Sequence, residues 1–261
     1  MSTDKSCKIV AFANQKGGVG KTTSAVNAAA CFGKNGKKTL LVDFDPQGNA
    51  TSGVGMEKKQ GASSYELIME ANPYETVAHT PFENLDVIPS HIGLAAAELE
   101  LVDEDDRQFR LKSKLDMLRE DYEYIVIDCP PSLGLLTINA LSAADGVVVP
   151  MQCEFFALEG LSQLTYTISQ IRSKYNPRLA LYGVVVTMFD GRLNLSMQVL
   201  DELKKYFPNE LVSTPVPRNV RLSEAPGFGM PAVYFDRASK GAAAYEAIAK
   251  ELDKKIRSQK V

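Results

Sequence analysis

Six short runs rich in Val, Ile and Leu recur along this sequence, and stretches with helical spacing of apolar residues separate them. The runs are Lys8–Ala13, Thr39–Asp43, Leu85–Pro89, Tyr124–Asp128, Gly146–Met151 and Leu181–Thr187. Near-continuous apolar strands that alternate with helices are typical of a parallel sheet covered on both faces. The sequence therefore predicts an α/β fold, with a doubly wound, mostly parallel sheet flanked by helices.

The intervening helices are expected at Thr22–Asn35, Ile92–Val102, Arg107–Glu120, Leu135–Ala143, Phe156–Tyr175, Leu195–Phe207 and Lys240–Ile256. Residues 51–82 scatter Gly, Ser, Asn and Pro, which indicates an irregular excursion over the sheet and not a domain boundary. The chain has 261 residues and no internal repeat or low-complexity linker. We expect a single domain over residues 1–261, with Met1–Cys7 as a short N-terminal tail.

Composition narrows the class of protein without naming a function. The net charge is −3 and hydrophobic residues make up 45% of the chain, which excludes collagen-like, coiled-coil and wholly disordered proteins. The four cysteines form no CxxC pair and are expected to be buried, reduced thiols in a cytoplasmic protein. No segment reaches the roughly 18 apolar residues that span a bilayer, so no membrane partner is expected.

A glycine-rich segment follows the first run and precedes the first helix. It reads Asn14-Gln15-Lys16-Gly17-Gly18-Val19-Gly20-Lys21-Thr22-Thr23, and its Gly-Lys-Thr ending is the phosphate-loop signature. Glycines let backbone N–H groups curl around phosphate oxygens, and the helix N-terminus adds a positive dipole. Lys21 would reach the β- and γ-phosphates and Thr22 would bind Mg²⁺. The strict pattern needs Gly at position 15, where this chain has Gln15.

Carboxylates follow two other runs at the point where each strand should end. Asp43 and Asp45 share strand parity, so both would point the same way if the strand continued that far. One such acid can position the attacking water and another can hold Mg²⁺ through a water. Asp128 follows four apolar residues, the Walker B arrangement that brings a carboxylate beside Mg²⁺. Together with the loop upstream, these acids predict a nucleotide-hydrolysing site of the P-loop NTPase fold.

The segment KGGVGKTT resembles the deviant Walker A motif of the ParA/MinD-type ATPases, and VDFDPQGNAT and IDCPPSLG resemble the family's other two motifs. The resemblance implies that Lys16 crosses a dimer interface to the partner's nucleotide and that Asp45 orients the hydrolytic water. It leaves Asp43 as an outer-shell acid and Asp128 as a metal ligand through water. The nucleotide would lie on Lys16, Gly17, Gly18, Val19, Gly20, Lys21, Thr22 and Thr23.

The base pocket is less readable in the sequence. The segment Thr187–Asp190 follows a strand where a GTPase would carry its Asn-Lys pair, and it has none, which disfavours guanine. The segment PVPRN resembles the part of the family that cups adenine, which implies that Pro217 and Asn219 contact the base of ATP. A proline-rich structural loop is the alternative interpretation of the same residues.

The net charge conceals an uneven distribution. Residues 1–150 hold 14 basic and 21 acidic residues, and residues 151–261 hold 15 basic and 11 acidic ones. The acidic block Glu98–Asp106 is interpreted as a solvated helix end and loop. PRNVRLSEAP and RLNLSMQV resemble the chromosomal Soj/ParA branch, which implies that Arg192, Arg218 and Arg221 bind DNA without sequence preference. No base-reading module is visible.

The resemblance implies an Mg²⁺-dependent ATPase that is a homodimer when ATP-bound, binds DNA in the nucleoid, and partitions or positions DNA with a ParB/Spo0J-type partner. The few residues before the first strand leave no room for the DNA-binding domain of long plasmid ParA proteins. Two alternatives remain. One is a MinD-like membrane-associated ATPase, although the apolar stripe Tyr245, Ile248, Leu252 and Ile256 is better explained by packing on the sheet. The other is an ATP-dependent ligase or synthetase.

Overall fold

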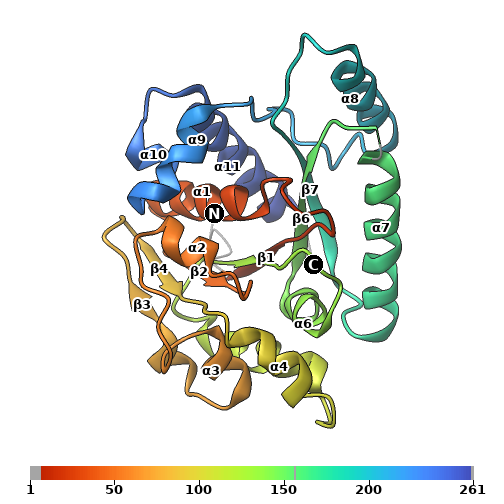
Figure 1. Ribbon diagram of the computed structural model, residues 1–261. Coiled ribbons are helices and arrows are strands. Elements are labelled where there is room, and N and C mark those ends of the chain that lie inside the picture. The colour runs from red at the N-terminus through yellow and green to blue at the C-terminus, as the bar shows by residue number, and fades with distance from the viewer. Residues whose placement is uncertain (1–6, 156, 260–261) are drawn as a thin grey trace.

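The computed structural model describes residues 7–155 and 157–259 and contains one seven-stranded sheet (Figure 1). The strand order is β3-β4-β2-β5-β1-β6-β7, and within the described part of the chain only β3 pairs antiparallel with its neighbour. The strands are β1 (Lys8–Phe12), β2 (Thr39–Asp43), β3 (Ala78–His79), β4 (Leu85–Ile88), β5 (Tyr124–Asp128), β6 (Gly146–Gln152) and β7 (Ala180–Thr187). The predicted fold class is confirmed.

Helices cover both faces of this sheet (Figure 1). The α-helices are α1 (Lys21–Lys34), α2 (Asn49–Gly53), α3 (Ser64–Met69), α4 (Leu94–Glu100), α5 (Arg110–Leu118), α6 (Leu135–Ala143), α7 (Ala157–Lys174), α8 (Asn194–Tyr206), α9 (Val220–Glu224), α10 (Ala232–Phe235) and α11 (Lys240–Ser258). Three 3₁₀ turns, η1 (Pro73–Thr76), η2 (Arg107–Phe109) and η3 (Ala225–Phe228), lie between them. Helices α1, α10 and α11 pack on one face, and α4 to α8 pack on the other.

Successive strand residues enter two different cores because side chains alternate across a sheet. In β1, Val10 and Phe12 join the core under α1 and α11, whereas Ile9 and Ala11 join the opposite core. Strands buried on both sides in this way have no polar face, which is why they appear in the sequence as continuous apolar runs.

The segment over residues 51–82 is more ordered than the sequence predicts, and the prediction of an irregular excursion is wrong there. It contains α3, η1 and the antiparallel strand β3, with Ser63 and Asn72 as the N-caps of the two helical elements. These elements are too short for a recognisable period.

Smaller differences concern helix ends and the C-terminal third. The helix expected at Arg107–Glu120 is divided into η2 and α5, and α9, η3 and α10 were not predicted. The expected start of α7 at Phe156 lies outside the described residues. All four cysteines are free thiols; Cys7, Cys31 and Cys129 are buried, as predicted, whereas Cys153 is only partly buried.

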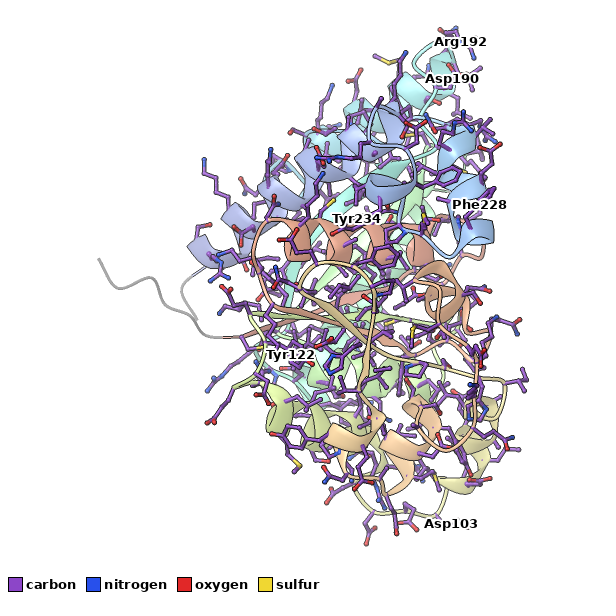
Figure 2. All side chains as sticks on the ribbon, turned by 90° about the vertical axis from the view of Figure 1, so that its left-hand side faces the viewer. Asp103, Tyr122, Asp190, Arg192, Phe228 and Tyr234 are labelled. Carbon is purple, nitrogen blue, oxygen red and sulfur yellow. The ribbon has the colours of Figure 1, made fainter. Side chains whose placement is uncertain are left out.

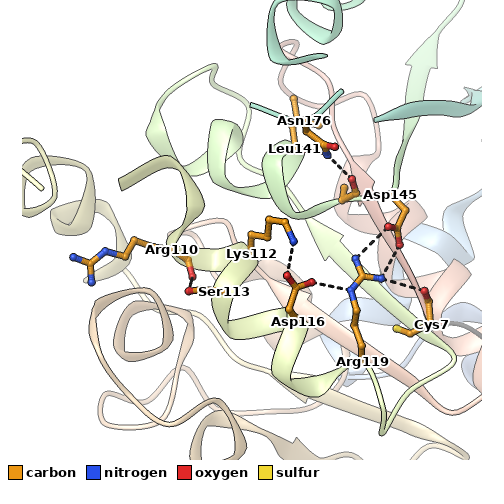
Figure 3. A network of polar contacts seen from close by, with 10 residues as sticks. Cys7, Arg110, Lys112, Ser113, Asp116, Arg119, Leu141, Asp145 and Asn176 are labelled. Carbon is orange, nitrogen blue, oxygen red and sulfur yellow. Dashed lines mark hydrogen bonds and ion pairs between the residues drawn. The ribbon is translucent and has the colours of Figure 1, made fainter. Parts of the chain in front are cut away.

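An ion-pair network joins three elements at the amino edge of the sheet (Figure 3). The guanidinium of Arg119, just after α5, donates to both carboxylate oxygens of Asp145 at 3.0 and 3.1 Å and to the Cys7 carbonyl at 3.2 Å. Asp145 also accepts the amide of Ile9 at 2.7 Å. The Asp145 carboxylate therefore fixes the start of β1 and the loop before β6. The side chains of Arg119 and Asp145 are both largely shielded from water.

We predict that Asp145→Asn lowers the free energy of unfolding by about 2 kcal/mol, because the partly buried guanidinium of Arg119 loses one of its two carboxylate partners and keeps only Asp116. Urea denaturation of the two proteins at neutral pH measures the difference. Asp201→Asn is the matched control, since Asp201 pairs with Lys204 on the open surface and should change stability by less than about 0.5 kcal/mol. Equal effects of the two substitutions would contradict the prediction.

Candidate nucleotide-binding site

The strands β1, β2 and β5 bring the predicted site residues together at their carboxyl ends. Strand pairing places Asp128 opposite Phe12 on one side and opposite Asp43 on the other. The loop that follows β1 therefore begins beside two carboxylates. In open α/β sheets, ligands bind at this edge, beside the strand at which the strand order reverses. Here that strand is β1, because β2 lies on one side of it in the sheet and β6 lies on the other.

The glycine-rich loop enters α1 through two glycines in the left-handed region. Gly18 and Gly20 have φ values of +73° and +85°, where a side chain would strain the backbone. Gly20 is the N-cap of α1, and no side chain caps this helix end. The first amides of a helix have no partner within the helix. This end therefore offers N–H groups and a positive dipole to an anion.

Side chains from three strand ends hold the loop in place, and the sequence did not single out these roles. Asn14 donates to the Pro150 carbonyl at 2.8 Å and accepts the Lys16 amide at 3.0 Å. Gln152 donates to the Gly18 carbonyl at 2.9 Å, and Thr187 donates to the Val19 carbonyl at 2.7 Å. Their signal in the sequence was only their position, at or just after the ends of β1, β6 and β7. The loop is thus fixed to the sheet before any ligand arrives.

Lys21 is buried beside the loop, with 6% of its surface exposed. Its Nζ donates to the Lys16 carbonyl at 3.0 Å, so the side chain folds back along the loop. Burial lowers the pKa of Lys21, and the nearby Asp128 carboxylate acts in the opposite direction. A phosphate group at this position would raise the pKa of Lys21 again.

The carboxylate of Asp128 is fully buried, and among the described residues neither of its oxygens has a hydrogen bond of good geometry, although the Thr22 hydroxyl and the Lys21 ammonium are close enough to favour its charged form. Burial raises the pKa of Asp128 well above its usual range, and the charge of Asp43 adds to the shift. Buried carboxylates without partners are rare unless they serve a ligand. Oxygen donors are the ligands that Mg²⁺ prefers, so Asp128 together with the Thr22 hydroxyl at the start of α1 fits a magnesium site.

Asp43 is fully engaged by its own chain. Its carboxylate accepts the amide and the hydroxyl of Thr51 at 2.7 and 2.6 Å and the amide of Asp45 at 3.3 Å. Burial raises the pKa of Asp43 to about 6, against these hydrogen bonds. Asp43 therefore positions the segment that carries Asp45, and its role as an outer-shell magnesium acid stays a prediction.

Asp45 reaches the site through a turn and not through strand parity, because β2 ends at Asp43. Its Oδ1 accepts the Gln47 amide at 3.0 Å, and its charge acts on both Lys21 and Asp128. The condition attached to the parity argument, a strand that continues to Asp45, is not met. The turn nevertheless keeps the side chain largely buried at the same edge of the sheet.

Lys16 points away from its own loop. Its ammonium pairs with Glu154, just after β6, and about half of the side chain is exposed. The two lysines of the loop thus differ: Lys21 is buried against the site and Lys16 lies at its rim.

A cavity of about 470 Å³ adjoins the loop. Gly20 and Thr23 line one side, and Pro217, Arg218 and Asn219 line the other. The two residues predicted for the adenine therefore lie within reach of the loop. Asn219 also caps α9, where its Oδ1 accepts the Arg221 amide at 2.9 Å, which leaves its NH₂ group as the available donor.

The three arginines predicted for DNA differ in their surroundings. Arg192 is exposed at one tip of the molecule and makes two hydrogen bonds to Asp190, at 2.8 and 2.6 Å (Figure 2). These bonds lower the pKa of Asp190 to about 2. Arg221 pairs with Glu224 and Asp236. Arg218 is exposed and forms no ion pair within the described ranges.

We predict that Asp128→Asn stabilises the nucleotide-free protein by about 1–2 kcal/mol near pH 8, because a neutral amide costs less to bury than an unpaired carboxylate. A carboxyl with a raised pKa makes the wild-type chain lose stability as pH rises through that pKa. The gain from Asp128→Asn should therefore shrink as the pH is lowered. Thermal melting in EDTA from pH 6 to pH 9 measures it, and a variant that melts below the wild type throughout would contradict the prediction.

Comparison with known proteins assigns this site to a family. A family model described as an AAA domain matches residues 7–181. The sporulation initiation inhibitor protein Soj of Bacillus subtilis is 53% identical over 247 residues, which cover 94% of this chain and 98% of that protein. The chromosome partitioning protein ParA of Myxococcus xanthus is 49% identical over 250 residues, which cover 95% and 88%.

A solved structure extends the match to the full fold. The structure described as cobyrinic acid a,c-diamide synthase from Mycobacterium smegmatis, with bound ADP and magnesium, is 36% identical and superposes with a TM-score of 0.85 over 97% of this chain and 96% of that one. The open N-terminus of α1 and the buried acids are consistent with the similarity to these two relatives. The chain belongs to the ParA/Soj family of chromosome-partitioning ATPases.

Proposed function

We propose that this ATPase is switched by ATP between a monomer and a dimer, and that the dimer binds DNA without sequence preference. In this role it partitions or positions chromosomal or plasmid DNA together with a ParB-type partner, in the cytoplasm on the nucleoid. The observation that carries the proposal is the position of Lys16. It stands at the rim of an otherwise complete phosphate site, half exposed and paired only with Glu154 among the described residues.

The chain's own residues account for nucleotide binding in a single subunit. The amides from Gly17 to Thr23 and the ammonium of Lys21 would hold the phosphates, and Pro217 and Asn219 would contact the adenine. Thr22 and Asp128 would hold Mg²⁺, which when bound neutralises charge on the phosphate oxygens. Asp45 would orient the water that attacks the terminal phosphate.

Pairing of two subunits would complete the site. Lys16 would leave Glu154 and reach the nucleotide of the partner, where a phosphate offers more negative charge than one carboxylate. Two apolar side chains at the same edge, Leu133 after β5 and Phe155 after β6, are exposed by 39% and 76%. Apolar side chains exposed beside a site are typical of a surface that is covered in an assembly.

DNA binding would depend on this pairing. Two of the three arginines are partly neutralised by their own carboxylates, Arg192 by Asp190 and Arg221 by Glu224 and Asp236. Of these three arginines, only Arg218 is left without an ion pair within the described residues. Because phosphate contacts add along the DNA, two paired subunits would bind where one does not.

A membrane role has little support. The apolar stripe of α11, which contains Tyr245, Ile248, Leu252 and Ile256, is buried in the core under that helix. It is therefore unavailable to a lipid surface. In the part of the chain that the structure describes, no helix has the length and apolar character needed to cross a bilayer.

A ligase or synthetase function is the second candidate, because the 36% identical structure is described as a synthase. That structure is covered over 96% of its length, so an extra domain does not separate the two functions. The partitioning proteins are more similar, at 53% and 49% identity over nearly the whole chain. ATP-dependent binding to random DNA would favour partitioning over a synthetase.

We predict that Lys16→Ala weakens ATP-dependent dimerisation at least about ten-fold, since the contact across the interface is lost. Glu154→Gln should keep dimerisation and move it to lower protein concentrations, because it releases Lys16 beforehand. Analytical ultracentrifugation with a non-hydrolysable ATP analogue measures both. Lys59→Ala, at an exposed surface lysine, is the control. A monomer–dimer profile unchanged by Lys16→Ala would refute the interface role.

We predict that Arg218→Glu weakens the binding of the ATP-bound protein to random DNA at least about ten-fold and flattens its salt dependence. Arg178→Glu makes the same change of charge at an exposed arginine of the opposite, amino edge and should have little effect. Asp190→Asn should strengthen binding a few-fold, because it frees Arg192. Fluorescence anisotropy over a salt series measures all three. Equal losses for Arg218→Glu and Arg178→Glu would mean that only overall charge matters.

A further inference from the structure

An apolar row is exposed to solvent along α4 and the turns at its two ends. Ile92, Leu99 and Val102 are 68%, 79% and 49% exposed. They are separated by seven and three positions: Leu99 lies in α4, and Ile92 and Val102 lie in the hydrogen-bonded turns directly before and after it. Residues at this spacing share one face of a helix. A soluble protein rarely leaves such a row uncovered unless it serves as an interaction site.

The other face of α4 is fully used. Leu94, Ala97 and Leu101 are buried in the core beneath the helix. The exposed row is therefore not a misplaced core face, and rotation of the helix would bury one row only by exposing the other.

Acidic side chains surround the exposed row. The segment Glu98–Asp106 holds six acids and no base. Glu100 accepts the Tyr65 hydroxyl at 2.8 Å and Glu104 pairs with Arg110. Asp103, Asp105 and Asp106 have no ion pair within the ranges that the structure covers. Charges left uncompensated beside an apolar row favour a partner that is both apolar and basic.

This surface is connected by hydrogen bonds to two segments of the nucleotide site, the loop that follows β5 and the segment that follows β2. Glu98 accepts the Leu136 amide at 3.2 Å, at the start of α6, directly after the loop that follows Asp128. At the other end of α4, the Ser90 amide donates to the Thr51 hydroxyl at 2.8 Å, and that hydroxyl donates to Asp43. A partner bound to α4 would thus act, through these hydrogen bonds, on the segments that carry the site's carboxylates.

The surface also lies far from the arginines proposed to bind DNA. Asp103 and Arg192 are at opposite ends of the molecule (Figure 2). A basic partner on α4 and DNA on the arginines would not compete for one surface.

We propose that the α4 surface, defined as Ile92, Leu99, Val102 and the acids Asp103, Asp105 and Asp106, docks a short basic amphipathic helix of a partner protein. Apolar side chains of that helix would cover the row, and its Lys and Arg would face the acids, as in other helix-in-groove recognition. The inference rests on the proposed function, since the partner would be the ParB-type protein that regulates ATP hydrolysis.

The test uses the full chain and the ParB-type protein of the same organism, with ATP, Mg²⁺ and random DNA. One variant is Leu99→Gln with Val102→Gln, and a second is Asp103→Asn with Asp105→Asn. Met117→Gln with Glu120→Gln is the control, because it changes an exposed apolar and an exposed acidic residue at α5. Affinity for the partner, basal and partner-stimulated ATP hydrolysis, and ATP-dependent dimerisation are measured for each.

Both α4 variants should bind the partner at least about ten-fold more weakly and lose its stimulation, while basal hydrolysis and dimerisation stay within two-fold of wild type. Wild-type affinity should fall with salt more steeply than that of the aspartate variant. If the partner stimulates both α4 variants as it does the wild type, the docking surface is wrong and the proposed function stands. If it does not act on the wild type either, the proposed function fails and the inference with it. Loss of dimerisation in the α4 variants would make this face a contact between copies of the chain and would also overturn the inference.

Discussion

The buried carboxylate of Asp128 is the constraint on which the rest of the site depends. The strand pairing of β5 with β1 and β2 places it between Phe12 and Asp43 without access to water. An uncompensated charge in that position costs stability, and here it stands beside a second carboxylate. Burial of the apolar strands on either side offsets this cost. The fold is therefore stable enough to hold an acid at a position where only a cation or a proton can balance its charge.

The phosphate loop solves the complementary problem of keeping amides unpartnered. Its backbone must remain open to a ligand while its position stays fixed. Gln152 and Thr187 achieve this from outside, since they donate to loop carbonyls, and Asn14 ties the start of the loop to β6 while it occupies one amide, that of Lys16. Lys21 is held in the same way through the Lys16 carbonyl. The geometry that receives phosphates is thus built by three strand ends that are distant in sequence.

The strands and the chemistry at their ends were predictable because both depend on local patterns. Apolar runs defined six strands to within one or two residues, and the Gly-Lys-Thr ending defined the loop. The two-residue strand β3 was not predictable, because Ala78 and His79 form a strand only through pairing with β4. The same limit applies to Asp43, whose oxygens are taken by Thr51 eight positions away, and to the pairing of Lys16 with Glu154. Such contacts arise from the packing of distant segments, which no single window of sequence contains.

The distribution of charge shows how pairing in the fold changes what a count of residues implies. The basic excess of the C-terminal part suggests a cationic surface, yet Arg192 and Arg221 already face carboxylates. The acidic excess of the N-terminal part is likewise divided, because Glu98, Glu100 and Glu104 each hold a contact within the fold, whereas Asp103, Asp105 and Asp106 remain open. Among the residues considered for partners, Arg218 and the three aspartates are left without an ion pair in the part of the chain that the structure describes. Under the proposed function, a single subunit would bind weakly at each end, and its affinity for DNA would depend on the ATP-bound, paired state.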